Sequence, residues 1–454
     1  MDARLTFPPA PAACAALLLL FAAVPAHGQG EYFGEVRKTE LFRIPIVVED
    51  FGIELPAGIS AIYDSRGERA EDVLAQDLLF TDAFLVMREP AGVGAPLGGR
   101  LDIRGLPVDQ PIQARVRGRV EPGKGGARFE LTLVEESSQA EIISCSYPAI
   151  PEGESEPDRW QMHLWADEVT RYLTGSPGCA ATRIAFIREI QGGKELFLID
   201  WDGHEEEAVT GFGSVIVAPA WHPAGHRLAF TTYHHGPPNL VALDLGTRRM
   251  ITLSAGPTPT ACAYSPDGRQ VAFSTTAGGN AEIYVARADG SQPRRLTFDP
   301  GIDTAPSWSP SGDRLVFTSD RSGTPQLYIM DADGSNLVRL TFSGKWNDSP
   351  DWSPNGRWIA HVCSIEGKFD LALVGADGLS GGRLTEGGGC EDPRWAPDSR
   401  HLVFARQQGG LRNLWILDVD SGELRQLTGS RAQTYNPAWS PPAEQRLRAS
   451  SATG

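Results

Sequence analysis

The sequence has few cysteines, no long apolar run beyond its first residues and no excess of positive charge. Six of its 454 residues are cysteine, of which an odd number remains after the first 28 residues, and no Cys-x-x-Cys pair occurs, so we expect no zinc site. After the first 28 residues, no apolar segment approaches the ~20 residues that cross a bilayer, so we expect no direct membrane insertion. A net charge of −16 argues against nucleic acid as a partner.

What the chain does contain is a repeat with a period of 43 or 44 residues. The best copy, Thr304–Asp348, holds four short apolar stretches separated by Ser-Pro-x-Gly and Asp-x-Asp-Gly turns. No copy contains ten residues of helical periodicity, which excludes a helical solenoid. Four strands per copy are typical of a β-propeller blade. Each copy carries one aromatic residue at the same place: Trp221, Tyr264, Trp308, Trp352, Trp395 and Trp439.

The two ends of the repeat array complete each other. Arg183–Ala220 lacks the aromatic-Ser-Pro opening, whereas Tyr435–Pro441 is an opening with no blade after it. Five whole copies and one shared copy predict a six-bladed β-propeller over 180–441, with the last strand closing the first blade. Residues 442–454 are predicted to be a disordered tail.

The first part of the chain has no repeat. Residues 1–28 have the pattern of a signal peptide, because the 13-residue apolar run Ala12–Val24 is followed by small residues. We therefore expect an exported, soluble protein. Residues 31–179 predict a small N-terminal α/β domain, with helices at Glu68–Thr81 and Arg159–Leu173.

The predicted strand Ile112–Val120 places Arg115, Arg117 and Arg119 on one face. This row could form a site for an acidic ligand, but a solvated sheet face is the favoured interpretation.

Two cysteines, Cys363 and Cys390, fall on the same face of the predicted propeller. A disulfide is possible in an oxidising compartment, although buried free thiols are favoured.

No catalytic, metal or cofactor site is recognisable. The turns that begin at Asp200 and Asp331 lack the twelfth-position glutamate of a calcium loop. A cluster of histidines is expected to be an exposed loop rather than a metal site: His222, His226, His234 and His235. The chain ends 15 residues after Trp439, which leaves no room for the hydrolase domain that follows some propellers. A binding role, rather than an enzyme, is therefore the expectation.

The junction before the repeats resembles that of the TolB family, as do the Trp-Ser-Pro openings. The residues that carry the resemblance are His163–Val169, Leu173-Thr174-Gly175, Thr182–Phe186, Trp308-Ser309-Pro310, Trp352-Ser353-Pro354 and Pro437–Pro441. The resemblance implies a non-enzymatic periplasmic scaffold of the Tol-Pal system that supports envelope integrity and constriction at cell division. It implies a Pal-like outer-membrane lipoprotein as partner, and contacts of the N-terminal domain with the inner-membrane Tol proteins. The alternative is a secreted propeller enzyme or surface sensor that binds a glycan or peptide.

The partner site is predicted at one mouth of the propeller channel, where loops lead into the inner strands. In the family the Pal lipoprotein binds over this mouth, and Val217, Ala261 and Thr304 are expected at matching positions. Acidic groups from three blades would focus an electrostatic field there, unless they merely keep the rim solvated. The candidate residues are Val217, Thr260, Ala261, Asp303, Thr304, Asn347, Asp348, Glu391, Asp392 and Tyr435.

Overall fold

The computed structural model of the chain describes residues 43–53, 60–81, 83–89, 111–123, 126–146, 157–255, 257–429 and 432–443. The predicted signal peptide and residues 444–454 of the predicted tail lie outside the described residues. Among the residues described, no helix is long and apolar enough to cross a membrane.

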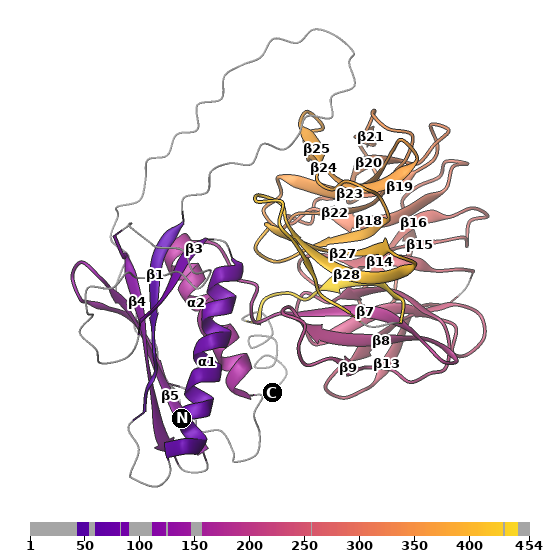
Figure 1. The fold of residues 1–454 in the computed structure, drawn as a ribbon. Coiled ribbons are helices and arrows are strands. Elements are labelled where there is room, and N and C mark those ends of the chain that lie inside the picture. The colour runs from indigo at the N-terminus through magenta and orange to yellow at the C-terminus, as the bar shows by residue number, and fades with distance from the viewer. Residues whose placement is uncertain are drawn as a thin grey trace, which may run out of the picture. The chain divides into compact units, whose positions relative to one another are not determined.

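An α/β domain precedes the repeats, as predicted. Its sheet has the order β3-β1-β4-β5-β6, with β2 beside β4. The two helices, α1 (Ser60–Phe80) and α2 (Pro157–Thr174), pack together and cover one face of the sheet (Figure 1). The strands are β1 (Ile44–Glu49), β2 (Gly52–Ile53), β3 (Phe84–Glu89), β4 (Ala114–Gly123), β5 (Gly126–Glu135) and β6 (Glu141–Ser146).

Large side chains from both layers fill the core of this domain. Leu74 and Leu78 of α1 and Trp165 of α2 are fully buried, together with Phe84 and Phe129 of the sheet. Helical spacing therefore predicted most of the inward residues, but Tyr172, which it placed in the apolar stripe of the second helix, is 56% exposed. The first helix begins at Ser60, earlier than the predicted Glu68.

The favoured interpretation of the arginine row is wrong for Arg115. This side chain is mostly buried, and it donates to Glu136 at 2.5 Å and to Glu49 at 3.3 Å. Arg117 also donates to Glu49, at 3.3 Å. The positive charge of these two residues is thus balanced by carboxylates of neighbouring elements.

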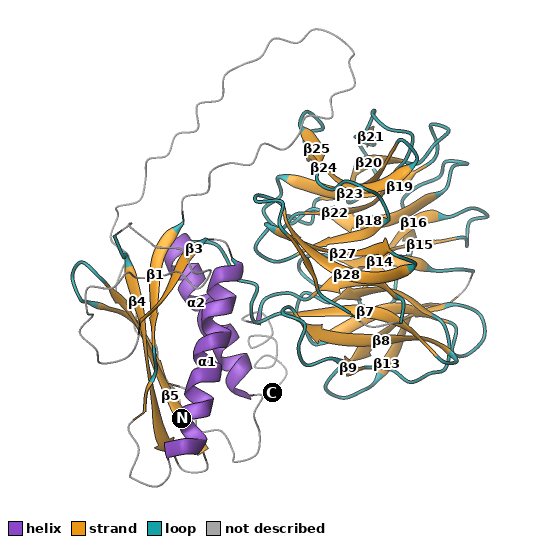
Figure 2. Cartoon of the chain, viewed as in Figure 1, coloured by secondary structure: helices purple, strands orange, loops and turns teal. Residues whose placement is uncertain are grey.

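The repeats form six four-stranded antiparallel sheets arranged as a propeller (Figures 1 and 2), which confirms the predicted architecture. The sixth sheet has the order β30-β7-β8-β9, so the last strand of the chain closes the first blade. From inner to outer, the first five sheets are β10 (Ile216–Trp221), β11 (Arg227–Thr232), β12 (Asn239–Asp244), β13 (Met250–Ala255); β14 (Thr260–Tyr264), β15 (Gln270–Thr275), β16 (Glu282–Arg287), β17 (Arg294–Arg295); β18 (Asp303–Trp308), β19 (Arg314–Ser319), β20 (Gln326–Asp331), β21 (Val338–Arg339); β22 (Asn347–Trp352), β23 (Trp358–Ile365), β24 (Lys368–Gly375), β25 (Gly381–Arg383); β26 (Cys390–Trp395), β27 (His401–Gln408), β28 (Leu411–Asp418), β29 (Leu424–Gln426). The closing sheet comprises β30 (Thr434–Trp439), β7 (Arg183–Ile190), β8 (Gly193–Asp200) and β9 (Glu207–Ala208).

Three of the repeated tryptophans join neighbouring blades through the indole N–H. The indole N–H of Trp221 donates to the carbonyl oxygen of Ala438 at 3.0 Å, across the closure of the ring. Trp308 and Trp395 make the same bond to the inner strand of the preceding blade, at 3.1 and 3.0 Å. A tryptophan at this position therefore satisfies its polar atom while its ring is buried between two sheets.

The threonine that ends most repeats also has one structural role. In the blade formed by β18–β21, Thr341 accepts the backbone N–H of Leu327 at 2.9 Å and donates to Gln326 at 2.9 Å. This threonine thus accepts the hydrogen bond of an N–H group near the start of the third strand that has no backbone acceptor. The same bond to a third-strand N–H, also at 2.9 Å, is made by Thr210, Thr297, Thr385 and Thr428.

The five cysteines of the described residues are free thiols, as favoured. Cys179, Cys363 and Cys390 are buried.

Removal of Tyr435–Gly454 should destabilise the whole propeller. The deletion takes away nearly all of β30, which pairs with β7, and the Trp439 indole that donates to Thr182 at 2.8 Å. Because each blade is supported by both neighbours, we expect the thermal midpoint to fall by about 10 °C or more.

Removal of residues 444–454 alone is the matched control, since it leaves every described strand intact. Its thermal midpoint should lie within about 2 °C of the full chain. Equal midpoints for the two truncations would contradict closure by β30.

Acid should destabilise the fold through His361 in β23. Burial lowers the pKa of this imidazole to about 4, whereas the unfolded chain protonates it near 6.5. The folded pKa is depressed, so the stability it contributes is present above pH 6.5 and is lost as the pH falls toward 4. We expect a loss of about 2 kcal/mol by pH 5.

Urea denaturation at pH 7 and pH 5 measures this loss. The variant His361→Gln cannot titrate and should show a smaller drop between the two pH values, whereas the exposed His235→Gln should follow the wild type. An identical drop in wild type and His361→Gln would refute the assignment.

Candidate functional site: the front face of the propeller

The six inner strands begin at the same end of the propeller, which we call the front face. These strands are β10, β14, β18, β22, β26 and β30, and each contacts the next around the ring. The hairpins between second and third strands lie at the same end, because the strands alternate in direction. All ten candidate residues lie within the first three positions of the inner strands, rather than in the loops before them.

Each inner strand contains a bulge that the sequence analysis missed. In five of the strands the pairing with the second strand shifts after the second residue, and the third residue has a positive φ. In β14 the shift follows the first residue, and the second residue has the positive φ. The six φ values are 42–53°. The six residues are Ala218, Ala261, Ala305, Ser349, Asp392 and Asn436. Such a conformation costs of order 1–3 kcal/mol in a residue that is not glycine, so the surrounding ring must hold it. A proline follows in five of the six strands and was the available signal.

This bulge corrects one predicted correspondence. Thr260 pairs with the second strand as Val217 and Thr304 do, whereas Ala261 occupies the bulge position. The residue that matches Val217 and Thr304 is therefore Thr260, because β14 begins one residue later than the other inner strands.

The bulge residues divide the channel wall into an apolar and a polar part. Three successive strands contribute alanine, whereas the next three contribute Ser349, Asp392 and Asn436. Asp392 accepts hydrogen bonds from Asn436 at 2.7 Å and from Ser349 at 3.3 Å. The Asp392 carboxylate thus joins three blades.

Two of the predicted binding residues are buried and hold the fold instead. Asp303 is 0% exposed and accepts from the guanidinium of Arg321 at 2.7 Å. Asn347 is buried as well, and its amide donates to Gln326 at 3.0 Å. The first position of an inner strand points into the blade, so these side chains are not available to a partner.

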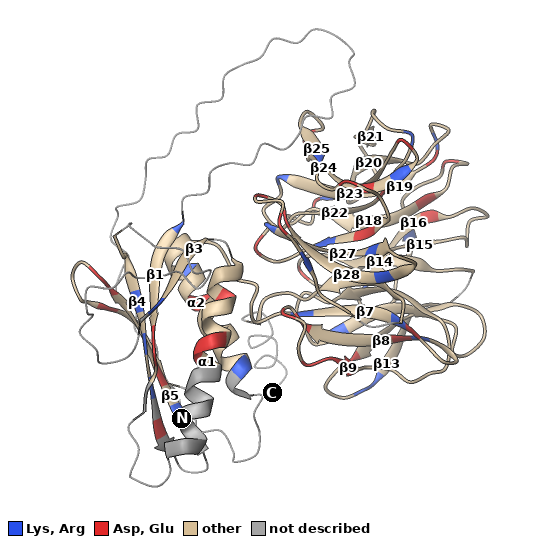
Figure 3. Ribbon diagram, in the orientation of Figure 1, with Lys and Arg blue, Asp and Glu red and all other residues tan. Residues whose placement is uncertain are grey.

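The remaining acidic residues of the rim are interspersed with basic ones. Glu391 accepts from Arg412 at 2.8 Å, and burial raises the pKa of this carboxyl. The ring of Tyr435 lies 3.9 Å from the ammonium of Lys194 and 4.8 Å from the Arg412 guanidinium. Figure 3 shows the same mixture of charges over the propeller strands. The field at this mouth is therefore weaker than the acidic residues alone would produce.

Exposed apolar side chains gather on the front face, and the sequence analysis did not single them out. Phe298 and Phe342 are each 73% exposed, and each lies under the guanidinium of a neighbouring arginine. Trp346 contacts Phe369 edge to face, with ring centres 6.0 Å apart. Of the fifteen exposed large apolar residues in the described chain, eight lie at this end: Ile190, Val215, Tyr233, Phe298, Ile302, Phe342, Trp346 and Phe369.

One sequence pattern suggests a hydrolase but does not form its active site. Gly378–Gly382 spells Gly-Leu-Ser-Gly-Gly, which matches the Gly-x-Ser-x-Gly of a nucleophile elbow. In the structure it is a hairpin turn between β24 and β25, where Gly378 donates to the Gly375 carbonyl at 2.8 Å. The strand-turn-helix geometry that exposes a nucleophilic serine is not formed by these residues.

Comparison with known proteins agrees with this geometry. A family model described as the TolB beta propeller domain matches residues 170–443. Tol-Pal system protein TolB of Anaeromyxobacter dehalogenans (strain 2CP-C) is 37% identical over 298 residues, which cover 65% of this chain and 66% of that protein. Its counterpart in Bordetella avium (strain 197N) is 31% identical, with 64% of this chain and 63% of that protein covered. The match thus spans just under two thirds of these relatives.

A solved structure supports the fold over a longer stretch. The crystal structure of TolB from Acinetobacter baumannii superposes with a TM-score of 0.71 at 24% identity. The superposition covers 88% of this chain and 97% of that one.

Replacing Asp303 and Asp348 should separate structural from surface carboxylates. Asp303→Ala leaves the mostly buried Arg321 without its partner, so we expect a loss of about 3 kcal/mol in the free energy of unfolding. Asp348→Ala removes a partly exposed carboxylate and should cost less than about 0.5 kcal/mol. Urea denaturation of the two variants measures both values, and equal losses would mean that the Asp303–Arg321 pair has no structural role.

Proposed function

The chain belongs to the TolB family, and from this membership and the geometry of its front face we propose that it is a non-enzymatic scaffold of the Tol-Pal system. It would act in the periplasm, bind a Pal-like outer-membrane lipoprotein at the mouth of the propeller and support the envelope at division. The two relatives compared here are each named a Tol-Pal system protein, which supports the assignment. Contacts with inner-membrane Tol proteins are proposed for the N-terminal domain.

The observation that carries the proposal is the concentration of exposed apolar residues on the front face. Aromatic side chains at 40–73% exposure are costly in water, and such patches mark protein–protein contact sites. Phe342 and Trp346 lie on the loop that leads from β21 to β22 on the front face. These residues are suited to act as anchors, since aromatic residues dominate binding energy at interfaces.

The charged rim has a second role in this arrangement. Asp348 and Glu391 occupy the same position in neighbouring inner strands, with Lys194 and Arg412 nearby around Tyr435. A mixed rim of this kind orients a partner with complementary charges and affects the association rate more than the affinity.

A double substitution of the anchors tests the proposal. Isothermal titration calorimetry would measure binding of the soluble domain of the Pal-like lipoprotein from the same organism. We expect Phe342→Ala with Trp346→Ala to weaken the affinity by about thirtyfold or more, because two exposed aromatic anchors are removed.

The matched control replaces two exposed apolar residues at the start of the outer strand β21, in the blade that precedes the loop with Phe342 and Trp346. Leu337→Ala with Val338→Ala removes side chains that are 42% and 62% exposed but distant from the channel mouth in the blade topology. This variant should bind as the wild type does. Equal weakening by both double variants, or by neither, would contradict docking on the front face.

A further inference from the structure

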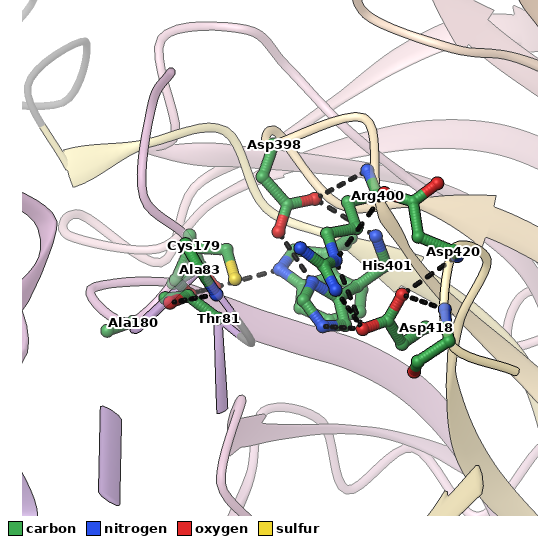
Figure 4. A network of polar contacts seen from close by, with 12 residues as sticks. Thr81, Ala83, Cys179, Ala180, Asp398, Arg400, His401, Asp418 and Asp420 are labelled. Carbon is green, nitrogen blue, oxygen red and sulfur yellow. Dashed lines mark hydrogen bonds and ion pairs between the residues drawn. The ribbon is translucent and has the colours of Figure 1, made fainter. Parts of the chain in front are cut away.

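The segment that joins α2 to β7 passes close to the β26–β27 turn of the propeller. Cys179 lies in this segment, and Asp398 and His401 lie in and after the turn. Figure 4 shows the Cys179 side chain directed toward His401, with Asp398 and Asp418 on different sides of the imidazole. None of these residues belongs to the front face.

The imidazole of His401 is held in one orientation. Asp398 lies 2.6 Å from Nδ1, and the other oxygen of this carboxylate accepts the backbone N–H groups of Arg400 and His401. Phe80 stacks on the ring, with centres 4.5 Å apart. With Nδ1–H donating to a carboxylate, the lone pair of a neutral imidazole is on Nε2, as in most histidines that bind metals.

The Nε2 atom has no hydrogen-bond partner among the described residues, although the His401 side chain is only 1% exposed. A buried nitrogen without a partner normally has an explanation, such as an ion or a water that occupies the site. The nearest carboxylate oxygen is that of Asp418, at 4.0 Å. Cys179 is 2% exposed, and its sulfur lies within 4.8 Å of a ring nitrogen of His401.

We propose that Cys179 and His401 bind a divalent zinc-class ion, with Asp418 as the third ligand and Asp398 as the positioning carboxylate. The ligand atoms of Cys179, Asp398 and His401 all lie within 4.8 Å of one another. Ligand atoms around a tetrahedral zinc are about 3.3–3.8 Å apart, which is slightly closer than the 4.0 Å between Nε2 of His401 and the Asp418 carboxylate. Thiolate, imidazole and carboxylate are the donors that zinc prefers.

The local charges are compatible with a dication. Arg400 is committed to Asp418 at 2.7 Å, and the guanidinium of Arg425 donates to the carbonyl oxygens of Trp201 and Asp202. Two carboxylates and a thiolate oppose these two cations. Burial and nearby carboxylates raise the pKa of Cys179 well above its usual value.

The site would fasten the segment between the two domains to the propeller. The absence of a Cys-x-x-Cys pair argued only against ligands close together in sequence, whereas here Cys179 and His401 are brought together by ring closure. A bound ion should therefore raise stability rather than supply a reaction.

Cobalt absorption on the purified, metal-free mature protein tests the proposal. Thiolate ligation of Co²⁺ produces an intense near-ultraviolet band, which should saturate at one equivalent and disappear on addition of Zn²⁺. Calorimetry with Zn²⁺ should give one site, and Zn²⁺ should raise the thermal midpoint.

Variants assign the ligands. Cys179→Ser should abolish the cobalt band, and Asp398→Asn should keep the band but weaken Zn²⁺ affinity about 10- to 100-fold. Cys363→Ser, which removes another buried thiol, should retain both. The wild type decides the question even where a variant fails to fold. Zn²⁺ binding without a cobalt–thiolate band, or a band that survives Cys179→Ser, overturns the proposal.

Discussion

Closure of the ring is the constraint on which the rest of the propeller depends. A blade buries its two faces only when it has a neighbour on each side, and β30 supplies the missing inner strand from the far end of the chain. The bond from Trp221 to Ala438 makes the closing contact equivalent to the contacts between sequential blades. Because every blade has two neighbours, no sheet face is left exposed at the ends of the array, and the strained bulges can be maintained around the whole channel.

Sequence periodicity predicted the features that repeat. The blade count and the closure by the last strand followed from the 43- or 44-residue period, because each copy of the repeat forms one blade. The orientation of individual side chains near the mouth did not follow. A bulge adds one residue to the inner strand, and a shift of one position reverses which face a side chain points to. Asp303 is fully buried, whereas the next residue, Thr304, is only half-buried.

The sequence could not predict contacts between distant segments, and the reason is a different one. The partners of Arg115 are Glu49 and Glu136, which lie far from it in the chain and carry no shared spacing. Cys179 and His401 meet only because the closing blade, which contains β30 and β7, joins the two ends of the array. Local spacing can reveal a metal site or ion pair on one element, but it contains no information about residues that a closed topology brings together.

The carboxylates and the exposed aromatic rings of the front face differ in what it costs to cover them. Asp303 is used inside the blade, where removal from water makes its pairing with Arg321 obligatory, and Glu391 is already paired with Arg412. A partner that relied on these carboxylates would have to break existing pairs. The exposed rings of Phe298, Phe342 and Trp346 impose no such cost, since covering them releases water and separates no charges. For the partner proposed at this face, apolar contact would therefore be the larger source of affinity, and the remaining charges would mainly determine orientation.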